Sequence, residues 1–157
     1  IFSQGAKERK LGFMESLVEH HVPYNEGQIV DAGETAAEGY LAARELLKDP
    51  KKRPTAIVCF NDMVAMGVYR AAHELGLDIP RDLSVTGFDG VELTEMMWPP
   101  LTTLNIFPET LGQKSAELLL KVIRNQVGRG FVTEWVDVEL IERGSVRPLA
   151  DAPVVVG

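Results

Sequence analysis

The sequence predicts an α/β fold in which helices cover both faces of a largely parallel sheet. Two continuous apolar runs rich in β-branched residues, 55–60 and 83–88, have the character of strands covered on both faces. A helix is predicted after each of them, over residues 62–75 and 91–97. Because strands and helices alternate along the chain, we expect parallel strands joined by right-handed crossovers.

Two helices and a short strand are predicted before residue 55. Apolar side chains recur at helical spacing over residues 7–20, and this run ends before Pro23. Residues 28–32 form a short strand candidate. Thr35 can cap a second helix that reaches about residue 47. These segments extend the same alternation toward the beginning of the chain.

The pattern changes after the Trp-Pro-Pro at residues 98–100. Residues 101–107 are predicted to be extended, and Pro108 suits the first turn of a helix that runs to about residue 125. Residues 133–141 alternate as a strand does. We therefore expect this last part to be an addition to the α/β core.

Composition favours one soluble globular domain. The 157 residues are 45% hydrophobic and 25% charged, and their net charge of -7 disfavours direct binding of nucleic acid. Cys59 is the only cysteine, which excludes an intramolecular disulfide and a cysteine-based metal site and fits a reducing compartment. The sequence holds no apolar run long enough to span a bilayer and no secretory signal, so we expect a cytoplasmic protein without membrane contact.

Polar residues follow the predicted strands at the edge where ligands bind in open α/β sheets. Glu34 follows the first strand candidate, Asn61 and Asp62 follow the second, and Asp89 follows the third. Asn61 and Asp62 could equally be helix caps, and Asp89 could equally be a turn-forming residue before glycine.

Arg9 on the first helix has the same ambiguity, because a solvated ion pair with Glu8 or Glu15 is the ordinary expectation for such a residue. Only a position beside the other polar residues would make Arg9 a candidate ligand-binding group.

No catalytic site is predicted. The three histidines, His20, His21 and His73, lack metal-ligand spacing, and no nucleophile motif, phosphate loop or dinucleotide fingerprint is present. We expect no metal, no cofactor and no enzymatic activity. An enzyme using Asp62, Asp89 and His73 would require these three groups to converge beside a pocket.

Several motifs in matching order resemble the LacI-type (LacI/GalR) bacterial transcription regulators. The most specific is AIVCFNDMVAMGVYRAAHELGLDIPRDLSVTGFDG at residues 56–90, followed by PPLTTL at 99–104. ERKLGF, TAAEGYLAA, LGQKSAELLL and IERGSV support the resemblance, which covers residues 7–148.

The resemblance implies a type I periplasmic-binding-protein-like fold, with two α/β subdomains joined by three chain crossings and an effector bound between them. Residues 1–105 would form the main part of the C-terminal subdomain, and residues 106–132 would belong to the N-terminal subdomain. Residues 133–148 would cross back, and residues 149–157 would be a tail. The family's DNA-binding helix-turn-helix has no counterpart in this sequence.

Site residues follow from the resemblance by position. Arg9 matches the family's effector-contacting arginine, Asn61 its cleft asparagine and Asp89 its effector aspartate. Glu34 falls where many sugar-responsive members carry a stacking aromatic residue, and Gly90 replaces a second acid. The implied effector is a small polar molecule such as a sugar or sugar derivative, which would be coupled to operator binding by the missing helix-turn-helix.

The resemblance also implies a homodimer, with Met96, Met97 and Trp98 near its interface. Packing in the core is an equally good explanation for these three side chains. The main alternative function is a secreted periplasmic sugar-binding protein of the same fold, serving transport or chemoreception.

Overall fold

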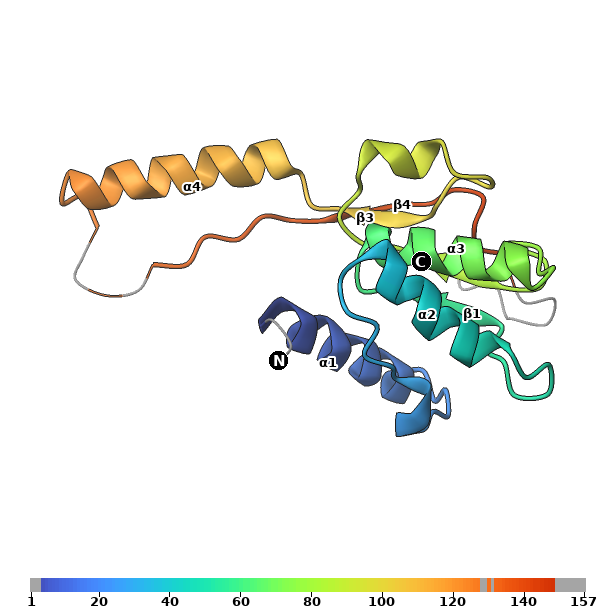
Figure 1. Ribbon diagram of the computed structural model, residues 1–157. Helices are drawn as coiled ribbons and strands as arrows, with labels where there is room; N and C mark the ends of the chain where they lie inside the picture. The colour runs from blue at the N-terminus through green and yellow to red at the C-terminus, as the bar shows by residue number, and fades with distance from the viewer. Residues whose placement is uncertain (1–3, 128–129, 131, 149–157) are drawn as a thin grey trace.

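The computed structural model describes residues 4–127, 130 and 132–148, so the predicted tail lies outside the described residues. A body of helices and strands carries one long helical arm (Figure 1). In chain order the elements are α1 (Gln4–Glu19), the 3-10 helix η1 (Glu26–Gln28), α2 (Ala36–Leu47), β1 (Ala56–Val58), α3 (Asp62–Glu74), β2 (Ser84–Thr86), the 3-10 helix η2 (Glu92–Glu95), β3 (Thr103–Asn105), α4 (Pro108–Ile123) and β4 (Glu139–Ile141).

The strands form two short ladders. β1 and β2 pair in parallel, with Ile57 opposite Val85, which confirms the predicted parallel arrangement. β3 and β4 pair antiparallel. Two isolated parallel bridges, Thr86 with Thr102 and Asp89 with Asn105, connect the β2 segment to the β3 segment, so β3 lies beside β2.

α2 and α3 pack closely against each other and carry most of the core. Thr35 caps α2 through a capping box with Glu38, and Asn61 caps α3, as both residue types favour. Gly39 allows the backbones of α2 and α3 to approach closely, because a Cβ added at Gly39 would lie 2.6 Å from the carbonyl oxygen of Val64. The buried apolar cluster comprises Ala43, Leu47, Cys59, Val64, Ala65, Val68, Ala71, Ala72, Leu77, Leu83, Val85 and Leu101.

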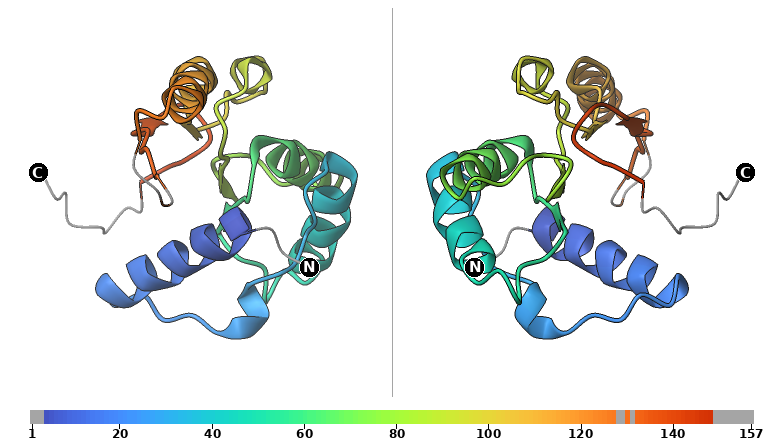
Figure 2. Two further views of the ribbon diagram at one scale, coloured as in Figure 1. Left: turned by 90° about the vertical axis from the view of Figure 1, so that its left-hand side faces the viewer. Right: turned by 90° about the vertical axis from the view of Figure 1, so that its right-hand side faces the viewer.

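α1 lies on the other side of β1 and β2 from the α2–α3 pair (Figure 2). None of its described residues is buried, and Leu11 and Val18 are exposed. Val58 in β1 is also 59% exposed. The expectation that residues 55–60 are covered on both faces is therefore wrong, because α1 leaves that face of β1 open.

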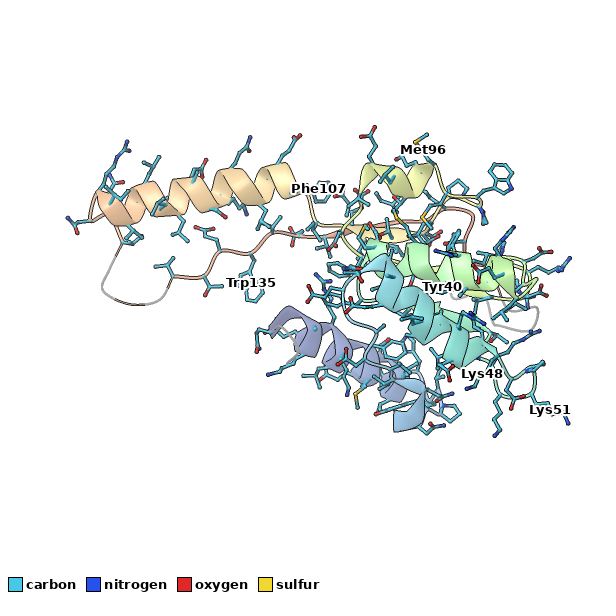
Figure 3. The ribbon with its side chains drawn as sticks, in the orientation of Figure 1. Tyr40, Lys48, Lys51, Met96, Phe107 and Trp135 are labelled. Atoms are coloured by element: carbon cyan, nitrogen blue, oxygen red, sulfur yellow. The ribbon has the colours of Figure 1, made fainter. Side chains whose placement is uncertain are left out.

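α4 and the returning chain extend away from the body as an arm (Figure 1). Phe107, in the left-handed region with φ of 47°, begins the arm, and Pro108 starts the helix as predicted. Not one of the α4 residues is buried. In Figure 3 the side chain of Trp135 projects from the returning chain, where it is largely exposed.

Two predicted strands are wrong or shortened because strands need ladder partners. Residues 28–32 form no strand: η1 ends at Gln28, and residues 29–33 belong to no helix or strand. Over residues 133–141 only β4 forms, because β3 offers three residues for pairing and residues 133–138 run beside α4 (Figure 1).

The helix predicted over residues 91–97 is reduced to the 3-10 turn η2. The buried hydroxyl of Thr94 donates to the carbonyl of Val91 at 2.6 Å and the amide of Met96 donates to Leu93, a spacing of three residues. The prolines at residues 99 and 100 favour an extended chain just beyond this turn, which prevents a longer helix.

Gly67→Ala is expected to lower the free energy of unfolding by about 1–3 kcal/mol, the usual cost of overpacking. The added Cβ would overlap the carbonyl oxygen of Ala36 and lie 2.5 Å from the amide nitrogen of Tyr40, both in the backbone of α2. Gly112→Ala in α4 is the matched control, because its Cβ would meet nothing within 4 Å. Urea denaturation measures both, and equal effects would contradict the close α2–α3 packing.

Candidate functional site

The ends of β1 and β2 meet at one edge of the parallel ladder. The amide of Asp62 donates to the carbonyl of Phe88 at 2.8 Å, so the two chains that leave the strands stay together beyond the ladder. We define the candidate site as the four residues gathered at this edge, Arg9, Phe60, Phe88 and Asp89. Asp89 is expected here from its place after a strand, and the family resemblance predicts both Arg9 and Asp89 as site residues.

Arg9 reaches this edge from α1, which is far away in sequence. Its Nη1 donates to the carbonyl of Phe60 at 2.7 Å, across 51 positions of sequence. Its guanidinium lies 3.6 Å from the ring centroid of Phe88 and 4.6 Å from that of Phe60. Such cation–π contacts are stronger when the cation is partly removed from water.

Arg9 and Asp89 form an ion pair rather than a hydrogen bond. Nη2 and Oδ1 are 3.6 Å apart, and each side chain is about one-third exposed, at 32% and 33%. This separation is too long for a hydrogen bond. The guanidinium and the carboxylate therefore both retain hydrogen-bonding capacity toward a third group placed between or beside them.

Burial shifts the ionisation of both side chains. Desolvation raises the pKa of the Asp89 carboxyl above its usual value, Arg9 opposes this rise, and the charge of Asp62 adds to it. Desolvation lowers the pKa of the Arg9 guanidinium, while Asp89 and Glu34 counteract that change. Asp89 is thus easier to protonate than an aspartate in water.

Asp89 has a backbone conformation that is costly for a residue with a side chain. Its φ is 112°, and the following Gly90 has φ of 74°. Strained positions of this kind cost about 1–3 kcal/mol each and cluster at functional sites. The Asp89 amide donates to the carbonyl of Leu104 at 3.0 Å, which holds the turn in place.

Asn61 and Glu34 lie beside the four site residues. The side-chain Nδ2 of Asn61 donates to the carbonyl of Glu34 at 3.0 Å, while its Oδ1 accepts from the backbone amide of Val64 at 2.8 Å. The structure thus confirms Asn61 as a helix cap and ties it to the loop before α2. The carboxylate of Glu34 is exposed and interacts electrostatically with Arg9.

Sequence reasoning missed Phe60 and Phe88. Both end predicted strands within apolar runs that are expected to be buried, yet they are only partly buried and stack against Arg9. One signal could have identified them: in Phe60-Asn61 and again in Phe88-Asp89, an aromatic residue comes directly before the polar residue that follows the strand.

The predicted interface residues divide into two kinds. Met97 packs against the core, as one of the two interpretations required. Met96 and Trp98 are 81% and 91% exposed, and Figure 3 shows Met96 pointing away from the body.

Two surface hollows lie away from the site. One of about 280 Å³ lies between α4 and residues 132–136, and another of about 350 Å³ is lined by α1 and Tyr24. Among the described residues, no three His, Cys, Asp or Glu side chains are arranged to hold a metal ion. No helix in the described part of the chain is long and apolar enough to cross a membrane.

Arg9→Gln is expected to raise the pKa of Asp89 further, because Arg9 is the charge that lowers it. Titration of the Asp89 carboxyl by NMR measures the change. Lys10→Gln is the matched control, since it removes an equal charge from the next, exposed residue of α1. An equal shift in both variants would mean that the Arg9–Asp89 pair is not formed in solution.

Comparison with known proteins supplies the family. Residues 2–146 match the model of the periplasmic binding protein-like domain. The chain is 40% identical over 145 residues to the HTH-type transcriptional repressor PurR of Pectobacterium carotovorum subsp. carotovorum, covering 92% of this chain and 41% of that repressor.

Solved structures of LacI-family regulators share the fold. A LacI family transcriptional regulator from Enterococcus faecium with bound ribose has a TM-score of 0.77 and 31% identity, covering 92% of this chain and 52% of that one. The lac repressor dimer bound to operator and an anti-inducer has a TM-score of 0.80 and 29% identity, covering 90% and 48%.

These similar proteins are transcription regulators rather than enzymes. The chain spans about two-fifths of the length of the curated relatives it matches. With a family model that matches nearly all of its length, the chain belongs to the periplasmic binding protein-like domain family, in the form found in the effector domains of LacI-type regulators.

Proposed function

We propose that this chain is the effector-sensing part of a LacI-type transcription regulator and that Arg9 and Asp89 contact the effector. The observation that carries the proposal is the approach of these two side chains to 3.6 Å at the shared edge of β1 and β2. Ligands of open α/β sheets bind at such an edge. The family relationship supports a sensing role for the same edge.

The geometry favours a neutral effector that offers a donor beside an acceptor. Asp89 accepts from the donor and Arg9 donates to the acceptor, each through a charge-assisted hydrogen bond. The lactam edge of an oxopurine has an N–H next to a C=O, and the curated relatives are repressors named PurR, which point to a purine-type effector. We therefore place a purine base first.

A pentose is the second candidate, because a similar regulator structure contains bound ribose. Neighbouring hydroxyls can also donate to Asp89 and accept from Arg9. Against a sugar stands Glu34, whose carboxylate occupies the position that the family resemblance assigns to a stacking aromatic residue. In this proposal Asn61 holds the Glu34 loop, and Glu34 adds negative charge beside Arg9.

We also propose that the arm belongs to a second subdomain. The chain leaves the body after β3, at about residue 105, and returns through residues 133–148 to pair as β4. Between them α4 exposes Leu119 and Ile123, which a second subdomain would cover. The division at residues 105, 132 and 148 remains the one that the family resemblance implies.

The whole protein would act as a homodimer that binds operator DNA through a helix-turn-helix outside this sequence. The similar lac repressor structure is a dimer bound to operator. Met96 and Trp98 offer an exposed apolar pair of the kind found in interfaces. Binding to chromosomal DNA would place the protein in the cytoplasm.

Calorimetric titration of the full-length protein with hypoxanthine, guanine and ribose tests the effector. We expect saturable binding of a purine base, reduced about 10- to 100-fold in Asp89→Ala because a charge-assisted hydrogen bond is lost. Affinity should also fall as pH is lowered through the raised pKa of Asp89, since the protonated carboxyl is a poorer acceptor.

Glu45→Ala is the matched control, because it removes an exposed carboxylate on α2. Saturable binding of ribose alone would replace the purine by a sugar. Tight binding that survives Asp89→Ala would refute the proposed site.

Trp98→Glu is expected to shift the full-length protein from dimer to monomer at micromolar concentration, because a charge would replace an apolar side chain in the interface. Sedimentation equilibrium measures the mass. Leu41→Glu on α2 is the control, since it places the same charge at another exposed apolar position. A dimer that persists in Trp98→Glu would move the interface elsewhere.

A further inference from the structure

We propose that Asp62 is a positioning residue for the effector site and that its buried carboxylate holds the turn of Asp89 against β3. The inference rests on the proposed function in one respect only, namely that Asp89 contacts the effector. Asp62 would not touch the effector itself. It would determine where the Asp89 carboxylate stands.

Asp62 is 0% exposed and is the first residue of α3. Its Oδ1 accepts from the hydroxyl of Thr103 in β3 at 2.6 Å, and its Oδ2 accepts from the amide of Val91 at 2.9 Å. Its own amide donates to the carbonyl of Phe88. One side chain thus joins α3, the turn that carries Asp89 and the strand that leads into the arm.

Helix capping does not account for this carboxylate. Asn61 already caps α3 through the amide of Val64 at 2.8 Å. The two oxygens of Asp62 instead accept from groups that lie 29 and 41 positions away in sequence. A carboxylate suits both partners, because each of its oxygens accepts one hydrogen bond, from the Val91 amide and from the Thr103 hydroxyl.

The turn leaves little room to adjust if Asp62 moves. A Cβ added at Gly87 would overlap Oδ1 of Asp62, and one added at Gly90 would lie 2.8 Å from the Cα of Asn105. The Asp89 amide, between these two glycines, donates to the carbonyl of Leu104. The turn is therefore clamped between α3 and β3, with Asp89 at its centre.

Thr103→Val tests the role, because it keeps the shape of a fully buried side chain and removes only the donor to Asp62. We expect the affinity for hypoxanthine or ribose, whichever binds the wild-type protein, to fall about tenfold, as loss of a hydrogen bond to a charged group predicts. Thr103→Ser keeps the donor and should restore most of this affinity. Thr133→Val is the control at an exposed threonine.

Hydrogen exchange in the full-length protein without ligand separates positioning from general destabilisation. Thr103→Val and Asp62→Ala should speed exchange of the amides of Asp89 and Val91, while the α2 amides keep their wild-type rates. Unchanged exchange at Val91, or equal acceleration everywhere, would overturn the proposal. If the wild-type protein binds neither hypoxanthine nor ribose, the proposed effector is wrong, and exchange at Val91 still decides the role of Asp62.

Discussion

The parallel, in-register pairing of β1 with β2 is the constraint on which the rest of the structure depends. It brings the chain after Val58 and the chain after Thr86 to the same edge, where the backbone amide of Asp62 donates a hydrogen bond to the carbonyl of Phe88. Two rings then lie close enough for one guanidinium to stack on both. A slip of one residue would turn every side chain of the shifted strand to the opposite face and separate these groups.

Sequence alone predicted the elements whose determinants are local. α2 and α3 follow from capping residues and helical periodicity, and Pro108 correctly begins α4. It overpredicted strands at residues 28–32 and 133–138, because a strand exists only if a ladder partner lies beside it. Partners far away in sequence cannot be recognised from the composition of a segment.

The contrast between local determinants and distant partners also separates the predicted parts of the candidate site from the missed ones. Asp89 could be placed at the edge because it directly follows a strand. The partner of Arg9 could not be predicted, since the acidic residues near it in the sequence are Glu8 and Glu15, while its partners in the fold are Asp89 and the carbonyl of Phe60. The sequence pattern likewise predicts Phe88 to be part of the core, because it shows that the residue is apolar and does not show which residue it contacts.

The positive φ of Asp89 lowers the stability of the fold, while its carboxylate serves the proposed contact with the effector. Glycine adopts that backbone conformation freely, so a laboratory selection for heat resistance that ignores regulation would enrich glycine at position 89. Such a variant would be well folded and abundant, and under the proposed function it would no longer respond to the effector. Under the proposed function, aspartate stands at this strained position for its contact with the effector and not for the fold.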